Sequence, residues 1–211
     1  MDLPEHSVPK NILILFAHPM IHRSNVNRAL VHAASQLDNV TVHDLYAAYP
    51  DFYIDVKYEQ ELLIEHDVII FQHPFYWYSS PPMLKMWQDL VLQYGFAYGS
   101  EGTALKNKEF MSVITAGASK STYESDGINR YTIDELLRPT EQMAYFTGMH
   151  YLPPHVIYGT HRIRARDIIL SVKAYRQLLT RLRDEPIHHE EKQHTDIWAA
   201  LLSLLTGQRN D

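Results

Sequence analysis

Short apolar runs alternate with helical patterns along this chain, and that alternation limits the available folds more than any other feature. The runs fall at 11–16, 40–45, 67–71, 109–115 and 155–158. The first and third are continuously apolar, which is typical of strands buried on both faces of a sheet. Helical segments separate the runs, and a long helix closes the series. The order predicts a doubly wound α/β fold, a five-stranded parallel sheet of order 2-1-3-4-5 with helices on both faces.

The chain is expected to form one domain, 1–185, followed by a C-terminal appendage, 186–211. With 211 residues and 45% hydrophobic composition, the domain is long enough to bury a full core. The appendage is polar at 188–192 and apolar at 197–205, which predicts a polar linker and a short amphipathic helix packed on the body or on a partner. The last helix of the domain should bury one stripe of side chains: Ile168, Ile169, Val172, Tyr175, Leu179 and Leu182.

The composition excludes several classes of protein. A formal net charge of -6 argues against nucleic-acid binding. The absence of cysteine excludes disulfides, thiol catalysis and Cys-ligated metal centres. No secretory signal is recognised, and no apolar stretch approaches the roughly 20 residues of a spanning helix. We therefore expect a cytoplasmic protein that could attach peripherally to the cytoplasmic face of the inner membrane. The basic segment 162–183 could meet a membrane or an acidic partner, although a solvated helix face is the simpler interpretation.

Unusual residues follow the first, third and fourth strands, whose carboxyl ends should lie side by side at the switch point of the sheet. After the first strand, Ser24, Asn25 and Asn27 stand at a helix N-terminus, where hydroxyl, amide and free N–H groups suit a phosphate. Four consecutive aromatics at 75–78 suit a flat apolar ligand, although they could instead fill space between helices or seal a subunit contact. Small residues at 115–118 would let the backbone approach a flat ring.

These motifs point to one phosphate rather than a pyrophosphate. Neither G-x-G-x-x-G nor G-x-x-x-x-G-K-[ST] occurs, so a dinucleotide-binding fold or an NTPase is disfavoured. Likewise, the absence of G-x-S-x-G gives little support to serine hydrolysis. A single phosphate at a capped helix, with a large flat ring between neighbouring loops, is best described by FMN.

Thirteen histidines raise the question of a metal site. Three of them lie beside two glutamates in the segment 188–194, but the H-E-x-x-H pattern is absent. A solvated linker is the preferred interpretation, and no metal site is expected. His18 and His73 each precede a proline at a strand end. For both we expect a structural hydrogen bond to a loop carbonyl, with contact to a cofactor phosphate as the alternative for His18.

A set of motifs spread over 11–183 fits one known pattern. They are Ala17-His18-Pro19, Ser24-x-x-Asn27, Gln72-His73-Pro74-x-x-Trp77-Tyr78-Ser79-x-Pro81 and Gly95-Phe96-Ala97-Tyr98-Gly99. This set resembles the NAD(P)H:quinone oxidoreductase family of flavodoxin-like proteins. Two further segments, Tyr49-Pro50-Asp51-Phe52 and Asn129-Arg130-Tyr131, are most similar to the ancillary proteins of bacterial glutathione-regulated potassium-efflux systems.

The resemblance implies a homodimer with one FMN per subunit near the subunit interface. NADH or NADPH would reduce the flavin, and a quinone would then take up two electrons. By position, the residues that would hold the phosphate and ribityl chain are His18, Ser24, Asn25, Val26 and Asn27. Those that would frame the isoalloxazine are Phe75, Tyr76, Trp77, Tyr78, Thr115, Ala116, Gly117 and Ala118.

Two departures from the family pattern bear on catalysis. The fourth loop commonly reads Thr-Thr-Gly-Gly, whereas residues 115–118 read Thr-Ala-Gly-Ala, and the added methyl groups crowd the ring side. In animal quinone reductases a tyrosine and a histidine six residues later are thought to relay a proton. Tyr123 matches the first and is the candidate catalytic residue, with a plain loop tyrosine as the alternative. Asn129 stands at the second position and cannot carry a proton at neutral pH. Slow turnover or another protonation path is expected.

Two functions are therefore in competition. The first is FMN-dependent two-electron reduction of quinones by NAD(P)H, in a protein that could also be the ancillary protein of a glutathione-regulated potassium-efflux antiporter. The alternative is a non-catalytic, flavin-binding regulatory subunit that docks on a membrane potassium/proton antiporter. Reduction of azo or nitro groups uses the same flavin chemistry and is a third, weaker reading.

Overall fold

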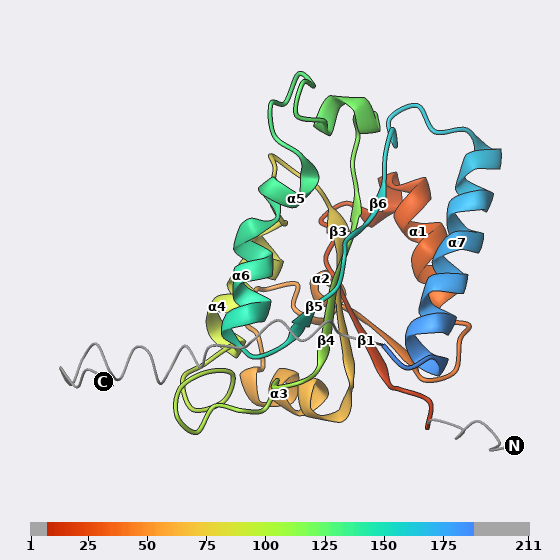
Figure 1. Cartoon of the computed structure of the whole chain (residues 1–211). Helices are drawn as coiled ribbons and strands as arrows, with labels where there is room; N and C mark the ends of the chain where they lie inside the picture. The colour runs from red at the N-terminus through yellow and green to blue at the C-terminus, as the bar shows by residue number, and fades with distance from the viewer. Residues whose placement is uncertain (1–7, 188–211) are drawn as a thin grey trace, which may run out of the picture.

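A parallel sheet lies at the centre of the computed structural model, which describes residues 8–187 (Figure 1). Its strands are β1 Ile12–Phe16, β2 Val40–Asp44, β3 Val68–Pro74, β4 Glu109–Thr115, β5 His150–Tyr151 and β6 His155–Ile157. The order β2-β1-β3-β4-β5, with every pairing parallel, confirms the predicted fold. The fifth strand differs from the prediction, because β5 and β6 pair with β4 on either side of a break at 152–154. Two prolines in that break lack the N–H groups that a continuous ladder needs.

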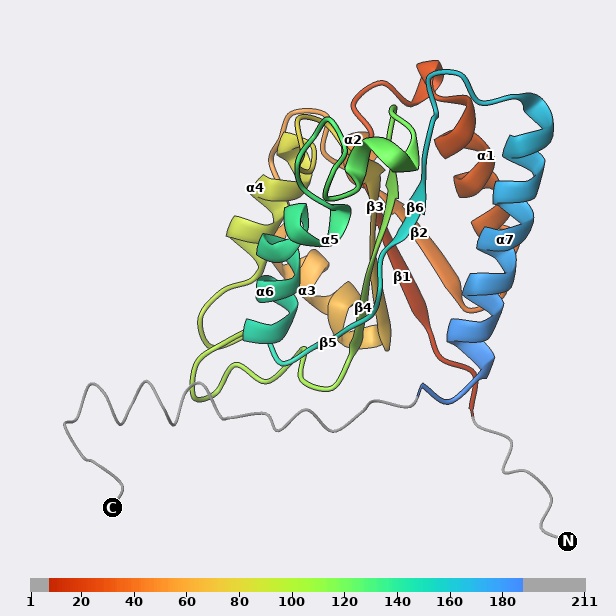
Figure 2. The same cartoon turned by 45° about the horizontal axis from the view of Figure 1, so that its top comes forward.

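Helices cover both faces of the sheet (Figures 1 and 2). One face carries α1 Asn25–Ala34 and α7 Ala165–Asp184, and the other carries α3 Val56–Glu65, α4 Pro82–Val91 and α6 Arg138–Phe146. Shorter elements are η1 Ile21–Arg23, α2 Leu45–Ala48, η2 Lys120–Tyr123 and α5 Ile133–Leu136. The helix predicted over 134–146 is divided between α5 and α6, because Pro139 stands in the first turn of α6, where proline starts a helix.

The sheet separates two apolar cores. Leu13, Leu15 and Phe71 pack into the core on the α3 and α4 side, whereas Ile12 and Ile14 pack into the core that α1 and α7 cover. Successive residues of a strand point to opposite faces. A strand that is apolar at every position must therefore be covered on both sides, as the continuous runs predicted.

Strand β3 extends beyond its predicted end at Phe71. Its three additional residues pair with β4 as Gln72↔Val113, His73↔Ile114 and Pro74↔Thr115. Gln72 is fully buried, and its side-chain oxygen accepts a 2.7 Å hydrogen bond from the Tyr175 hydroxyl of α7. A polar side chain is tolerated inside the core when it is hydrogen-bonded. As a result, the aromatic loop begins directly at the edge of the sheet, at Phe75.

Helix α7 buries fewer of its apolar side chains against the sheet than predicted. Tyr175, Leu179 and Leu182 are buried, and Ile168 and Val172 pack against the same core. Ile169, however, is 69% exposed, so its predicted burial was wrong. The next residue along a helix is turned by about 100°, which carries Ile169 off the buried stripe and into solvent. Within residues 8–187, no helix combines the length and apolar character needed to cross a bilayer.

The C-terminal appendage was predicted to be a polar linker followed by a short amphipathic helix. From residue 188 onward, the linker, its three histidines and the apolar stretch at 197–205 lie outside the described residues.

A buried carboxylate ties β2, α3 and α4 together. Glu59 of α3 has no exposed surface; it accepts hydrogen bonds from the Tyr49 hydroxyl at 2.5 Å and from Trp87 Nε1 at 2.7 Å. His43 Nε2 of β2 lies 2.6 Å from the same carboxylate. Burial raises the pKa of Tyr49, with a further contribution from Glu59, so its hydroxyl remains a donor. Because a buried carboxylate is tolerated only when it is paired and hydrogen-bonded, these contacts hold the segment after β2 against the body.

Replacing Glu59 by alanine should lower the free energy of unfolding by about 3 kcal/mol, because buried donors lose their acceptor. Glu61→Ala is the matched control on the same helix: its pair with Lys57 is exposed, and its loss should change stability by less than about 1 kcal/mol. Urea denaturation measures both values. Equal midpoints for the two variants would show that the buried carboxylate contributes no special stability.

Candidate functional site

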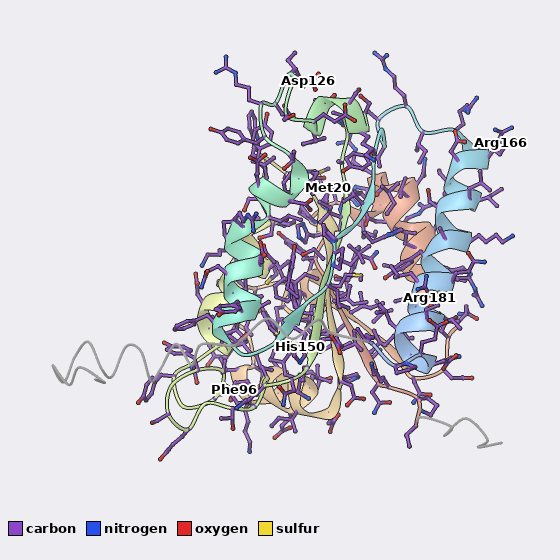
Figure 3. The ribbon with its side chains drawn as sticks, in the orientation of Figure 1. Met20, Phe96, Asp126, His150, Arg166 and Arg181 are labelled. Atoms are coloured by element: carbon purple, nitrogen blue, oxygen red, sulfur yellow. The ribbon has the colours of Figure 1, made fainter. Side chains whose placement is uncertain are left out.

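The loops that follow β1, β3 and β4 meet at one edge of the sheet. Thr115, the last residue of β4, joins them: its hydroxyl accepts a 2.9 Å hydrogen bond from Asn27 Nδ2 of α1, and its carbonyl accepts one from the Phe75 N–H, also at 2.9 Å. The rings of His18 and Tyr76 lie edge to face with centroids 6.1 Å apart. Side chains proposed from three separate segments are therefore brought together. Figure 3 shows Asp126, in the loop after β4, at this end of the molecule, and Phe96 and His150 at the opposite end.

Ser24 begins α1 as its N-cap, and its hydroxyl accepts hydrogen bonds from both the backbone N–H and Nδ2 of Asn27, each at 3.2 Å. Asn25 is the first helical residue and its side chain is exposed, so it is not the cap. Val26 is buried in the core, which leaves only its backbone to face a ligand. Asn27 is itself buried, and within residues 8–187 its Oδ1 atom has no hydrogen-bond partner.

His18 and His73 are both buried, and each makes a local hydrogen bond. His73 Nδ1 lies 2.9 Å from the Pro74 carbonyl, which is the kind of partner that the sequence predicted. For His18 the expected carbonyl partner was wrong: Nδ1 accepts from the Met20 N–H at 3.1 Å. Burial lowers the pKa of His18, so the ring is neutral and carries its proton on Nε2. That N–H remains a donor.

The aromatic loop divides its side chains between core and solvent. Phe75 is buried, whereas Tyr76 and Tyr78 are exposed and Trp77 is 93% exposed. Trp77 and Tyr78 have φ values of 48° and 64°, and reciprocal hydrogen bonds between Tyr76 and Ser79 close the turn around them. Positive φ at both central positions is typical of a type I′ turn and is uncommon for bulky residues. The sequence left open that these aromatics only fill space between helices. Among the four, that description fits Phe75, which packs in a core cluster.

A hydrogen bond joins the side chains of Tyr123 and Asn129, the two positions singled out by the family resemblance. Tyr123 is buried between the rings of Phe75 and Tyr158, at 6.1 Å and 5.9 Å. Burial raises the pKa of Tyr123, Tyr78 raises it further, and the hydrogen bond with Asn129 opposes both effects. The Tyr78 hydroxyl also donates to Asn129 Oδ1 at 3.2 Å. Because burial raises its pKa, Tyr123 stays protonated at physiological pH, and Asn129 joins its side chain to that of Tyr78.

The loop after β4 packs against a residue that sequence reasoning missed. Ala116 is buried, and Gly117 and Ala118 lie at the surface of the loop. A Cβ atom at Gly117 would lie only 2.2 Å from Nε2 of His161, which belongs to the loop between β6 and α7. No motif surrounds His161. The signal that could have found it is topological, since it follows the strand that pairs with β4 and so leaves the sheet at the same edge.

The chain is similar in sequence and in structure to several known proteins. The profile of a family described as a flavodoxin-like fold matches residues 10–179. The glutathione-regulated potassium-efflux system ancillary protein KefG of Pectobacterium atrosepticum is 48% identical over 186 residues, which is 88% of this chain and 100% of that protein. The structure of general stress protein 14 of Treponema denticola in complex with FMN has a TM-score of 0.79 at 39% identity, over 82% of this chain and 99% of that one. An NADPH-quinone reductase from P. pentosaceus has a TM-score of 0.74 at 35% identity, over 81% and 98%.

His73 should make stability depend on pH. Burial lowers its pKa from 6.5 to about 4, so between those values the unfolded chain binds a proton that the folded chain does not. The free energy of unfolding should therefore decrease by up to about 3 kcal/mol as the pH falls from 6.5 to 4. His73→Gln should flatten this slope relative to His32→Gln, an exposed control on α1. Urea denaturation across this pH range gives the slopes, and identical slopes would contradict the assignment.

Proposed function

The chain belongs to the flavodoxin-like family, whose profile matches residues 10–179, and on that premise we propose that it is an FMN-dependent NAD(P)H:quinone oxidoreductase. The observation that carries the proposal is the junction of Asn27 with Thr115, where a buried amide oxygen lacks a donor beside a capped helix N-terminus. Buried polar atoms without a partner are rare in proteins and call for an explanation. A ribityl hydroxyl is a donor of the required kind. The FMN complex of general stress protein 14 and the NADPH-quinone reductase structure support the same reading.

The residues at this junction fit a flavin mononucleotide. The phosphate would meet the free N–H groups of the first turn of α1, helped by the positive end of the helix dipole. The Ser24 hydroxyl, whose oxygen already accepts from Asn27, still has its proton to donate, and the neutral His18 ring offers its Nε2–H. The isoalloxazine would lie between the exposed faces at 75–78 and the small residues at 115–118.

When bound, FMN supplies the two-electron redox chemistry, and the protein binds, orients and shields it. The buried Tyr123 hydroxyl remains protonated because burial raises its pKa, so its role would be to donate a hydrogen bond to an acceptor in the site. Asn129 would orient that hydroxyl. The exposed aromatic surface of Tyr76 and Trp77 offers a platform on which a quinone or nicotinamide ring could stack. A homodimer would cover this surface from the other side and exclude water.

A second candidate function is a flavin-binding regulatory subunit of a membrane potassium/proton antiporter, without turnover of its own. The observation in its favour is the outer face of α7, where Ile169 and Leu170 are exposed between Arg166 and Lys173. Figure 3 shows Arg166 in the first turn of this helix. The similarity to KefG, an ancillary protein of a glutathione-regulated potassium-efflux system, agrees with it. In that case the protein would be cytoplasmic and attached peripherally to the inner membrane.

Asn27→Leu should weaken FMN binding about tenfold, because it removes the amide that meets Thr115 and the cofactor while keeping a similar volume. Ser35→Ala, at the opposite end of α1, is the control and should bind as the wild type does. Quenching of flavin fluorescence gives the dissociation constants. A wild-type protein that is colourless and refuses added FMN would end the proposal. Bound FMN without NAD(P)H oxidation in the presence of a quinone would favour the regulatory subunit.

Tyr123→Phe should lower kcat for quinone reduction by roughly tenfold or more and leave the FMN dissociation constant unchanged, since the change removes one donated hydrogen bond. Tyr131→Phe, an exposed tyrosine in the following loop, is the matched control. Steady-state rates with a soluble quinone and flavin titrations separate the two effects. A Tyr123→Phe variant as active as Tyr131→Phe would make Tyr123 a packing residue only.

A further inference from the structure

His161 lies where the loop between β6 and α7 crosses the end of β4, and this loop passes beside the start of α1 in both views (Figures 1 and 2). Its imidazole rests on the backbone of Gly117, so closely that an added Cβ would lie 2.2 Å from Nε2 and 2.3 Å from Cδ2. Gly117 belongs to the loop that would frame the isoalloxazine. The ring of His161 is therefore at the border of the proposed cofactor site.

The backbone on both sides of this contact is fixed by hydrogen bonds. The Gly159 N–H donates to the Ala118 carbonyl at 2.7 Å, and the Thr160 N–H donates to the Ala116 carbonyl at 3.1 Å. The Thr160 hydroxyl donates to the same Ala116 carbonyl at 3.2 Å, and the Ala116 N–H donates to the Ile157 carbonyl at 2.8 Å. The loop that carries His161 is thus clamped to the end of β4, which places this residue beside Gly117.

The space beside Gly117 is filled by the His161 ring. The φ angle of Gly117 is not left-handed, whereas that of Gly159 in the facing loop is. A backbone that is not left-handed accepts alanine without strain. What excludes a side chain at Gly117 is the close approach of His161.

The polar atoms of His161 are not used inside the protein. Within residues 8–187 the structure gives its side chain no hydrogen bond and no ion pair, and the residue is exposed. His18 and His73, two other histidines at this end of the sheet, are buried and each bonds a backbone group. A histidine that is held against a glycine, open to solvent and free at both ring nitrogens can bind a ligand without breaking a protein contact.

We propose that His161 is a further cofactor-binding residue, which donates a hydrogen bond from the loop between β6 and α7 to an acceptor atom of the flavin ring system. The inference rests on the proposed function, because Gly117 is expected to face the ring and not the phosphate. It adds a third wall to the site, from a strand that lies next to β4 on the side away from β3.

The test compares His161→Ala and His161→Gln with His32→Ala, an exposed histidine on α1. Dissociation constants for FMN and for riboflavin, which lacks the phosphate, are measured by quenching of flavin fluorescence on titration into apoprotein. His161→Ala should weaken both ligands about five- to tenfold, the effect of one hydrogen bond. His161→Gln keeps an N–H donor and should recover most of the loss, and His32→Ala should match the wild type. Thermal melting checks that each variant is folded.

Gly117→Ala provides an independent arm. In the wild-type background the new methyl group must displace the His161 ring, so flavin binding should weaken by about the same factor as in His161→Ala. In the His161→Ala background the part of this loss that comes from displacing the ring should be absent, so the same change should weaken binding less than in the wild type.

Several outcomes would overturn the inference. His161→Ala that binds as well as His32→Ala, or more tightly because the ring blocks the site, would remove His161 from the binding set. Weakening of FMN alone, with riboflavin unaffected, would assign the contact to the phosphate and overturn the ring contact. If the wild type binds neither ligand, the proposed function itself falls; if it binds both and the variants do too, only this inference falls.

Discussion

The structure depends on a backbone constraint. In a parallel sheet covered on both faces, the peptide groups of the inner strands can be satisfied only by the ladder. β1 is bonded to β2 and β3, and β3 is bonded to β1 and β4, so the chain can leave the sheet only where the ladder ends. Because the strands run in one direction, those exits gather at one edge. The loops of the candidate site therefore start from fixed points, at Phe16, Pro74 and Thr115.

Buried polar side chains differ in how fully they are hydrogen-bonded. Glu59 receives hydrogen bonds from tyrosine and tryptophan side chains, and a histidine nitrogen lies at 2.6 Å; Gln72 is bonded through its oxygen to Tyr175. At the edge where the loops meet, Asn27 is equally buried, yet its oxygen has no partner in the part of the chain that the structure describes. Such an atom is costly unless something binds it. Other buried atoms of the described residues, Gln72 Nε2 and Ser112 Oγ among them, are also unpaired. The Asn27 oxygen differs from these by its place, beside the capped start of α1 and the end of β4, and that place is the physical basis for expecting a ligand at the edge.

The edge combines groups with separate tasks. The capped start of α1 offers N–H donors and a favourable dipole for an anion. The turn at 76–79 displays aromatic faces in a conformation that bulky residues rarely adopt, and such conformations tend to persist at functional sites. Tyr123 and Tyr78 meet at Asn129, an amide that orients phenols but does not titrate. In the proposed function these groups would bind and orient FMN, and the electron transfer would belong to the cofactor.

The sequence by itself determined the order of elements and the sheet topology, because continuous apolar runs and the helical patterns between them are local features that can be recognised along the chain. It also located Asn27, Thr115 and the aromatic loop on neighbouring strand ends. Only the tertiary structure decided which of these side chains are free. Trp77 points into solvent because its turn has positive φ, Ile169 is exposed because the buried stripe of α7 is narrow, and His18 bonds an N–H instead of a carbonyl. His161 meets Gly117 through the pairing of β6 with β4, a contact between residues distant in the chain that no local pattern encodes.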